Sequence, residues 1–140
     1  MNTPASTAFL DTSGWFAALS PKEAKHRAAL AVYRRWIGDG VTLVTTNLVV
    51  AEMQILLGRF RGADEGLRFL DALYQDANHE VVFVDRDLER AAVDAWLRRF
   101  RDQRLSLADA VSFEVMRQRR IRHVLSLDEH FALAGFELAP

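Results

Sequence analysis

The hydrophobic positions of the chain form short, β-branched runs that alternate with longer amphipathic stretches. The short runs are bounded by polar residues, which is typical of buried strands, and the longer stretches repeat their apolar residues every three or four positions, which is typical of helices. The expected strands are residues 6–11, 41–45, 81–85, 121–128 and 136–139. Because strands separated by helices form βαβ units, the pattern predicts an α/β protein with a mostly parallel sheet and helices on both faces.

The expected helices begin and end at recognisable signals. Ser20, Pro21 and Glu23 have the spacing of a capping box with proline at the first helical position, which predicts a helix running to Gly38 or Gly40. The other helices are expected at residues 47–60, 62–77, 88–100 and 106–119. No repeat, low-complexity segment or linker divides the chain, so residues 1–140 are expected to form one domain.

The composition excludes several classes of protein. Half of the 140 residues are hydrophobic, which is enough to build a core, and there is no cysteine, which excludes disulfides and thiolate zinc sites. No apolar run approaches the roughly 20 residues of a membrane span. The N-terminus lacks a basic segment before a long apolar stretch, so we expect a cytoplasmic protein without an export signal. The net charge of −1 argues against a polycation that coats nucleic acid, but it leaves room for a local basic patch.

Four acidic residues stand where a parallel sheet would bring them together. Asp11 ends the first expected strand, and Glu52 lies in the helix after the second. Asp109 is in the first turn of the helix that leads into the fourth strand, and Asp128 ends that strand. Ligands of such sheets bind at the carboxyl ends of the strands. Carboxylates gathered there cannot all be ionised without a cation, and their hard oxygen atoms suit Mg²⁺ or Mn²⁺.

Each of these acids also has a structural explanation. Asp11 could cap a helix that follows its strand, and Asp128 could start a short turn. Ser106 and Asp109 have capping-box spacing, which favours a structural role for Asp109 taken alone. Glu52 is different, because it interrupts an apolar helical stretch in the middle, where it has no cap to make. Glu52 therefore favours the interpretation that the four acids form one cation site, rather than the interpretation that each acid caps a separate helix or turn.

Other chemistries find less support in the sequence. The four histidines are dispersed, Ser13 lacks the glycines of a nucleophile elbow, and no glycine-rich phosphate loop is present. We assign Asp85 to the cap of the helix that follows it and Glu114 to an exposed helical face. The residues expected in the core or at an interface include Trp15, Trp36 and Trp96.

Four phrases of the sequence resemble a known family. They are FLDTSGWFA with Asp11, TNLVVAE with Glu52, LSLADAVSFEVM with Asp109 and VLSLDEHF with Asp128. In this order, they closely resemble the PIN-domain ribonucleases, particularly the VapC-type toxins of bacterial toxin–antitoxin pairs. The resemblance extends from Phe9 to Phe136. It implies a three-layer α/β/α sandwich around a mostly parallel sheet, which agrees with the alternation of strands and helices.

The resemblance also implies an activity, an endoribonuclease that depends on Mg²⁺ or Mn²⁺, in which a metal-activated water attacks a phosphodiester in line. The implied metal-binding acids are Asp11, Glu52, Asp109 and Asp128. Asp128 would either bind the metal or orient the water. The polar groups lining the site would be Thr12 or Ser13. The implied partners are an RNA substrate, a second copy of the chain, and a cognate antitoxin that lies across the acidic groove and offers it an arginine.

Two alternatives stay open on the sequence. The chain could be a PIN ribonuclease of RNA processing without an antitoxin, or a non-catalytic α/β module that binds RNA or protein. In the module, the acids would serve only as caps. A catalytic cluster should bind Mn²⁺ and lose that binding in Glu52→Gln, whereas capping acids should show no metal effect. A small overlapping reading frame upstream would favour the toxin.

Overall fold

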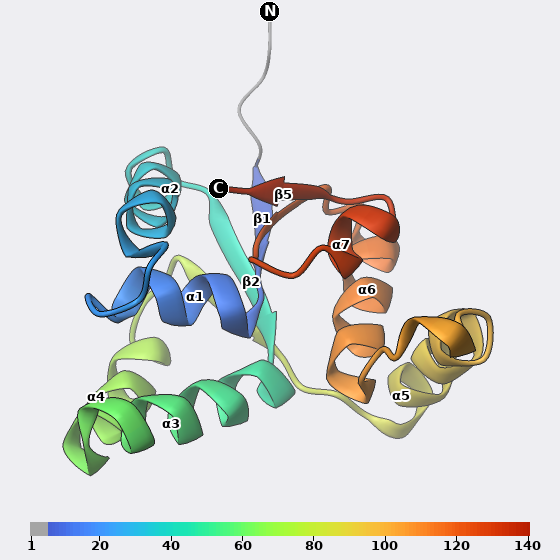
Figure 1. Ribbon diagram of the computed structural model, residues 1–140, viewed down its shortest axis with the longest axis horizontal. Helices are drawn as coiled ribbons and strands as arrows, with labels where there is room; N and C mark the ends of the chain where they lie inside the picture. The colour runs from blue at the N-terminus through green and yellow to red at the C-terminus, as the bar shows by residue number, and fades with distance from the viewer. Residues whose placement is uncertain (1–5) are drawn as a thin grey trace, which may run out of the picture.

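The computed structural model describes residues 6–140 as a five-stranded sheet between two groups of helices (Figure 1). The strands are β1 (Thr7–Leu10), β2 (Thr42–Thr46), β3 (His79–Val82), β4 (His123–Leu125) and β5 (Glu137–Ala139). Their order is β3-β2-β1-β4-β5, and every neighbouring pair is parallel. The predicted α/β class and parallel sheet are confirmed. Residues 1–5, on which the expected domain start and the expected lack of an export signal partly rest, lie outside the described residues.

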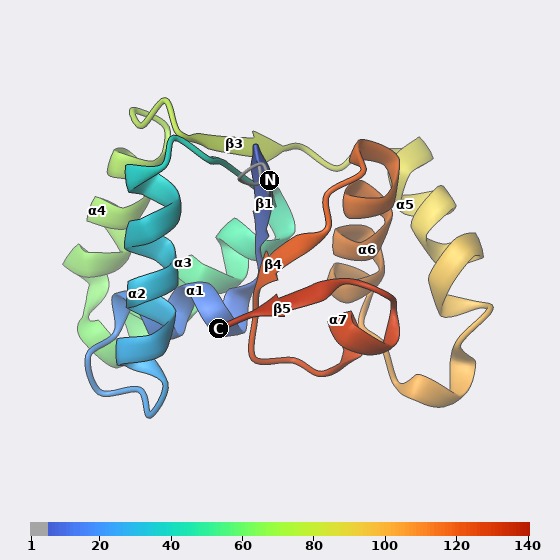
Figure 2. The ribbon, with the colours of Figure 1, turned by 90° about the horizontal axis from the view of Figure 1, so that it is seen from above.

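The two groups of helices cover opposite faces of the sheet, as the view from above shows (Figure 2). One group consists of α1 (Thr12–Leu19), α2 (His26–Gly38), α3 (Asn47–Arg61) and α4 (Ala63–Leu73). The other consists of α5 (Arg86–Ala92), α6 (Leu107–Arg119) and α7 (His130–Leu133). Two short turns follow α5, the π-helical η1 (Val93–Leu97) and the 3₁₀-helical η2 (Arg101–Gln103). Within residues 6–140, no helix is long and apolar enough to cross a membrane.

Side chains of the strands alternate between two cores, one on each face of the sheet. Ala8 and Leu10 of β1 pack with α1 to α4, whereas Phe9 between them packs with α5 to α7. Leu43 and Val44 of β2 divide in the same way. These two cores define the α/β/α sandwich. As predicted, the three tryptophans are core residues: Trp15, Trp36 and Trp96.

The start of α1 packs directly against the end of β4. A Cβ atom on Gly14 would stand 2.4 Å from the carbonyl carbon and oxygen of Leu125 and 2.6 Å from the Ser126 nitrogen. No side chain fits there, so only glycine allows this approach of the two backbones. The backbone nitrogen of Asp11 donates to the carbonyl oxygen of Leu125 at 3.1 Å. Together, these contacts fix the segment that carries Asp11 beside the segment that leads to Asp128.

The predicted helix start at Ser20 was wrong. The Ser20 nitrogen donates to the carbonyl oxygen of Phe16 at 2.9 Å, so Ser20 ends α1. The Glu23 nitrogen donates to the Ser20 carbonyl, and the His26 nitrogen donates to the Glu23 carbonyl. The residues with capping-box spacing therefore form successive turns, and α2 begins only at His26.

Four further elements differ in extent from the prediction, and one of them is the helix expected at 62–77, which is Ala63–Leu73. The strand expected at 81–85 is His79–Val82, because Val82 pairs with Thr46, the last residue of β2. The strand expected at 121–128 covers only His123–Leu125. The helix expected at 88–100 begins at Arg86, and its α-helical part ends at Ala92. The helices expected at 47–60 and 106–119 are confirmed within one residue at each end.

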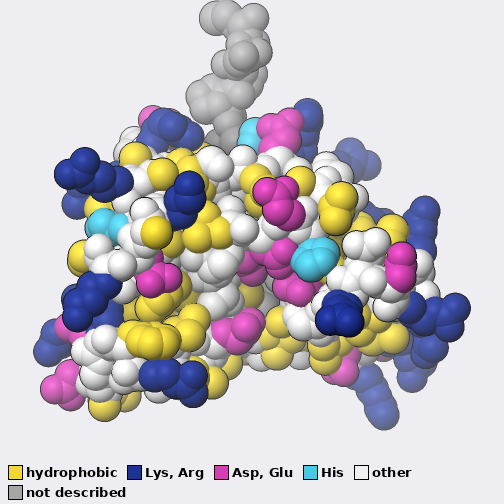
Figure 3. All heavy atoms as spheres, viewed as in Figure 1, with side chains coloured by type: hydrophobic (Ala, Val, Ile, Leu, Met, Phe, Trp, Pro, Cys, Tyr) yellow, Lys and Arg dark blue, Asp and Glu magenta, His cyan; other side chains and the backbone are white. Residues whose placement is uncertain are grey.

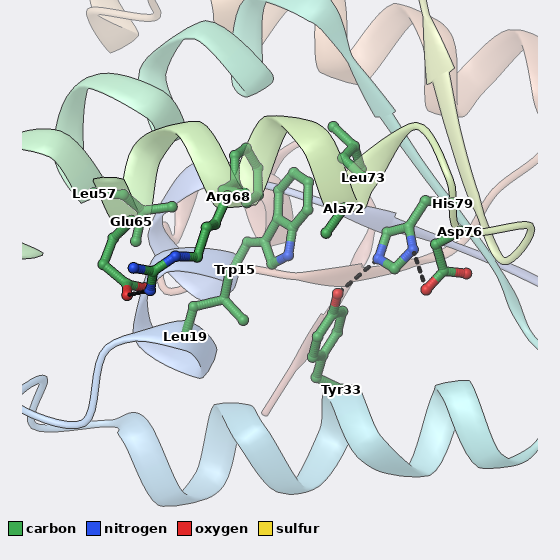
Figure 4. Close-up of a pocket in the computed structure, with 11 residues that line it drawn as sticks. Trp15, Leu19, Tyr33, Leu57, Glu65, Arg68, Ala72, Leu73, Asp76 and His79 are labelled. Atoms are coloured by element: carbon green, nitrogen blue, oxygen red, sulfur yellow. Dashed lines mark hydrogen bonds and ion pairs between the residues drawn. The ribbon is translucent and has the colours of Figure 1, made fainter. Parts of the chain in front are cut away.

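A cavity of about 310 Å³ lies between α1, α2 and α4, and His79, the first residue of β3, is part of its lining (Figure 4). The Tyr33 hydroxyl lies 2.6 Å from Nε2 of His79, whose Nδ1 lies 3.5 Å from a carboxylate oxygen of Asp76. The ring of Trp15 stacks on His79 with centroids 6.0 Å apart. Burial lowers the pKa of His79 and raises the pKa of Tyr33 to about 12. These contacts anchor the chain at His79, two residues before the predicted strand.

Candidate active site

The carboxyl ends of β1, β2 and β4 meet in the middle of the sheet. β1 is the central strand, and the chain reaches β2 on one side of it and β4 on the other. Such a switch in strand order leaves a crevice at the carboxyl ends. Acidic side chains gather in a central hollow of this face, with lysine and arginine side chains toward its margins (Figure 3).

Two serine hydroxyls hold the carboxylate of Asp11. Ser13 donates to Oδ2 at 2.9 Å, and Ser126 donates to the same oxygen at 2.7 Å. The same serines accept backbone N–H groups, Ser13 from Leu127 at 2.9 Å and Ser126 from Asp128 at 3.0 Å. The Asp11 side chain makes no capping bond to α1. The explanation of this acid as a helix cap is therefore wrong, and its buried carboxylate is oriented by the loop after β4.

Glu52 reaches the same edge of the sheet from α3. The hydroxyl of Thr12 donates to its Oε1 at 3.3 Å. The sequence suggested that α3 is apolar on nearly every side, but the helix buries one side, with Met53 and Leu57 among its residues, and Glu52 lies on the exposed side. The contact with Thr12, which directly follows Asp11, is what places Glu52 in the site.

Asp109 combines the two roles that the sequence allowed. The Ser106 hydroxyl accepts the Asp109 nitrogen at 3.0 Å, and Asp109 Oδ2 accepts the Ser106 nitrogen at 3.1 Å. The predicted capping box is thus formed. The negative charge of Asp109 also acts on the carboxyl groups of Asp11 and Glu52. A first-turn acid of α6 therefore caps its helix and faces the other acids at the same time.

Asp128 is held by the start of α7. Its Oδ1 accepts the backbone nitrogen of His130 at 2.9 Å and lies 2.8 Å from the Nδ1 atom of the same residue. The Phe131 nitrogen donates to the Asp128 carbonyl oxygen at 3.2 Å, which confirms the expected turn. The charge of Asp128 acts on Asp11 as well. All four predicted acids therefore lie at this edge of the sheet.

Each of the four acids uses one carboxylate oxygen in these hydrogen bonds. The bonded oxygens are Oδ2 of Asp11, Oε1 of Glu52, Oδ2 of Asp109 and Oδ1 of Asp128. Within residues 6–140, the second oxygen of each acid has no hydrogen-bond partner, and no lysine or arginine forms an ion pair with any of them. Oriented carboxylates with a free oxygen and no lysine or arginine partner are a donor set that fits a hard divalent metal.

The electrostatics of the site favour a cation. Burial raises the pKa of the Asp11 carboxyl, and the charges of Asp109 and Asp128 raise it further, against the lowering effect of the two serine bonds. Partial burial also raises the pKa of Glu52, helped by the charges of Asp11 and Asp109. In the part of the chain that the structure describes, no three Asp, Glu or His side chains yet surround one point closely enough to hold an ion. A metal ion bound here would have to draw these carboxylates closer together.

The sequence did not indicate two residues of the site, Ser126 and His130. It also gave a wrong expectation for the burial of Glu114, which lies outside the site. Ser126 bridges the Asp11 carboxylate and the Asp128 backbone; its signal is a serine two residues before an aspartate at a strand end. His130 had the same two-residue spacing from Asp128 but was counted among the dispersed histidines. Glu114, expected on an exposed face, is 0% exposed because it packs under Trp96.

The chain belongs to the PIN-domain family, whose family model matches residues 8–137. It is similar to VapC20 of Mycobacterium tuberculosis, a 23S rRNA-specific endonuclease, with 34% identity over 128 residues that cover 91% of this chain and 94% of the relative. The crystal structure of VapC20, described as a sarcin–ricin loop cleaving toxin, matches with a TM-score of 0.81 and 32% identity. That match covers 95% of this chain and 99% of the other.

Two more distant structures share the fold. A toxin–antitoxin complex from Klebsiella pneumoniae matches with a TM-score of 0.69 and 14% identity, and FitAcB from Neisseria gonorrhoeae with 0.67 and 15%. Each match covers 95% of this chain and 96% of the other. The family and the three-layer fold implied by the resemblance are therefore confirmed, and PIN nucleases generally depend on a divalent metal.

Proposed function

We propose that this protein is a divalent-metal-dependent endoribonuclease and the toxin of a toxin–antitoxin pair. The observation that carries the proposal is the set of four carboxylates at the carboxyl edge of the sheet, each oriented through one oxygen. The predicted activity and toxin class agree with the name of its homologue VapC20, which aligns over nearly the whole of both chains.

The metal would be Mg²⁺ or Mn²⁺, held by Asp11, Glu52 and Asp109, with Asp128 binding it or orienting the water. When bound, such an ion activates water and stabilises negative charge on a phosphodiester. The chain itself supplies orientation. Ser13 and Ser126 fix one oxygen of Asp11 and leave the other for the ion. Because two hydroxyls already hold the Asp11 carboxylate, this side chain loses less freedom when metal and substrate bind than a carboxylate without such bonds would.

The substrate would be RNA, and ribosomal RNA in particular. A groove of about 420 Å³ begins at Ser13 and Leu127, beside Asp11, and continues to Lys22 and Arg61. Basic side chains along a groove contact phosphates and position a strand. The groove, which also contains Glu23, therefore offers a path for the RNA backbone on one side of the bond that is cut. The choice of ribosomal RNA is supported by the similarity to VapC20, a 23S rRNA-specific endonuclease.

The protein partners would be a second copy of the chain and an antitoxin. Large apolar side chains are exposed on α3 and α4 and just after α4: Ile55, Leu67 and Tyr74. Exposed apolar side chains that gather on one surface are typical of an interaction site. We place the dimer interface on this surface and the antitoxin across the acids, where its arginine would replace the charge of the metal. Both events would take place in the cytoplasm. Leu67→Glu should give a monomer in light scattering, and an unchanged dimer would exclude this surface.

The activity is tested with total bacterial RNA in Mn²⁺, in Mg²⁺ and in chelator. The wild type should cut the RNA at discrete sites only with metal. Asp109→Asn should cut nothing, while its unfolding transition stays near that of the wild type because asparagine can still accept the Ser106 nitrogen. Asp85→Asn is the matched control: Asp85 also follows a strand, but its Oδ1 only caps α5 through the Leu88 nitrogen, at 2.8 Å. Full activity of Asp109→Asn would exclude the proposed site.

The toxin role has a separate test. Expression of the wild type should arrest bacterial growth, Asp109→Asn should not, and co-expression of the product of a neighbouring small reading frame should restore growth. A ribonuclease that cuts RNA in a metal-dependent manner but leaves growth unaffected would instead belong to RNA processing.

A further inference from the structure

A second pocket, here named the aromatic pocket, lies among η1, η2, α6 and α7. It has a volume of about 240 Å³. The residues that define it are Trp96, Phe100, Gln103, Phe113, His130 and Leu133. Trp96 and Phe113 are buried, Gln103 and His130 are partly exposed, and Leu133 is 71% exposed. The pocket therefore has an aromatic floor and a rim that is reached from solvent.

One side chain separates the aromatic pocket from the candidate active site. The His130 imidazole lines the pocket, and its Nδ1 atom lies 2.8 Å from Oδ1 of Asp128. A histidine side chain is visible beside the central acidic side chains in Figure 3. A strand of RNA whose phosphate lies at the acids thus has a neighbouring nucleotide within reach of the pocket.

The aromatic floor is rigid. The indole nitrogen of Trp96 donates to the buried Glu114 at 3.1 Å, which fixes the plane of the ring. Phe113 packs edge-on against Trp96 with centroids 5.1 Å apart, and Phe100 stacks on it at 5.8 Å. Trp96 itself lies in the π-helical turn Val93–Leu97, a rare conformation that is frequent at functional sites. A binding site with fixed walls loses little entropy when a ligand enters.

The size and chemistry of the pocket fit one nucleobase. The pocket is smaller than the roughly 300–1,000 Å³ clefts of drug-sized ligands, so it suits a single planar ring system. Unstacked RNA bases are bound on aromatic faces, and the Gln103 amide offers a donor and an acceptor to a base edge. In residues 6–140, no ion pair involves Arg99, Arg101 or Arg104, which surround Gln103 in the chain. Their positive charges complement the phosphates that accompany the base.

We propose that the aromatic pocket binds one nucleobase of the RNA substrate, turned out of its stack, from a nucleotide beside the phosphate that is cut. The inference rests on the proposed function, since the adjacent acids must engage that phosphate. The pocket then contributes to the choice of cleavage site, because only RNA that can release a base at this position places its backbone correctly at the acids.

The test uses the cut site mapped in total RNA with Mn²⁺. A synthetic RNA spanning that site is prepared intact and as a series in which one nucleotide at a time lacks its base. For the wild type, kcat/KM should fall about tenfold or more at one position next to the cut, the loss expected for one stacked base. Leu133→Ala and Gln103→Ala should lower kcat/KM on the intact RNA, and removal of the same base should then add little.

The control variant is Phe83→Ala, because Phe83 is 65% exposed and does not line the pocket. In Phe83→Ala, removal of the base should lower kcat/KM as much as it does in the wild type. The pocket does not hold a base if Leu133→Ala and base removal lower kcat/KM independently, so that their fold-changes multiply. The same conclusion follows if removal of each base beside the cut leaves kcat/KM unchanged. If Leu133→Ala weakens only inhibition by an antitoxin, a protein side chain occupies the pocket instead. Failure of the wild type to cut any RNA would overturn the proposed function. That result differs from those above, in which the wild type cuts RNA but the pocket does not bind a base.

Discussion

Replacing Asp11 with asparagine should stabilise the metal-free protein and remove its response to metal. Asp11 is only 8% exposed and lies near the charges of Asp109 and Asp128. Asparagine has almost the same shape, and its carbonyl oxygen can still accept the hydroxyls of Ser13 and Ser126. The substitution therefore removes the charge and keeps the local hydrogen bonds.

The direction of the effect follows from the pKa of Asp11, which is raised although two hydroxyls donate to its carboxylate. The charged form is therefore less favourable in the folded protein than in the unfolded chain, and each unit of such a shift corresponds to about 1.4 kcal/mol. We expect Asp11→Asn to be more stable than the wild type at neutral pH without metal, because the substitution removes a buried charge that no lysine or arginine neutralises. The difference should shrink as the pH falls through the raised pKa, because the wild type then becomes neutral as well.

Metal should reverse this order of stability and make the wild type more stable than Asp11→Asn. A divalent ion at a concentration 100 times its dissociation constant stabilises the folded state by about 2.7 kcal/mol, and Asp11→Asn does not receive this stabilisation because it has lost a ligand. The wild type should therefore unfold at the higher temperature in Mn²⁺ and Asp11→Asn at the higher temperature in chelator.

Thermal unfolding followed by circular dichroism measures both orders on the same samples. Asp85→Asn serves as the control, since asparagine caps a helix as well as aspartate does, and its Mn²⁺ response should match that of the wild type. The reasoning is refuted if Asp11→Asn is less stable than the wild type in chelator, or if Mn²⁺ stabilises both proteins equally.

Three further predictions concern close packing and buried polar groups in the fold. Gly14→Ala should destabilise the fold by about 1–3 kcal/mol or more in urea unfolding because its methyl group meets backbone, whereas Gly58→Ala, with its nearest atom at 3.8 Å, should be neutral or stabilising. Glu114→Ala should cost about 1–3 kcal/mol by the same assay, since it leaves the buried Trp96 nitrogen without an acceptor, and an unchanged midpoint would contradict the buried network. The lowered pKa of His79 means that the unfolded chain binds its proton more readily; stability should therefore fall as the pH drops below about 6.5, and His79→Gln should flatten that dependence.

Features encoded by neighbouring residues were predictable. The capping box of Ser106 and Asp109 formed as expected, because all its atoms belong to one turn. The cap at Asp85 formed for the same reason. Ser20 and Glu23 had an equally good local signal, but the packing of α1 used Ser20 to end a helix. A local pattern therefore predicts an element only when the tertiary contacts do not require the same residues elsewhere.

Burial was less predictable than secondary structure. Glu114 carries a charge on a helix and was expected in solvent, yet it is buried, because Trp96, 18 residues earlier, donates to it and Arg117 and Gln118 cover it. Glu52 was expected in apolar surroundings and lies on the exposed side of its helix. In both cases, the burial of the side chain depends on which other helices pack against its own helix. The residues near it in the sequence do not show this.

The sequence by itself determined the α/β alternation, the parallel sheet and the four acids in their order, because hydrophobic period and strand ends are local properties. Only the tertiary structure decided that Ser13 and Ser126 grip one oxygen of Asp11, that Asp109 is at once a cap and a neighbour of Glu52, and that an aromatic pocket adjoins Asp128. These arrangements join residues from opposite ends of the chain. They exist because Gly14 lets β1 and β4 bring their loops together at one edge of the sheet.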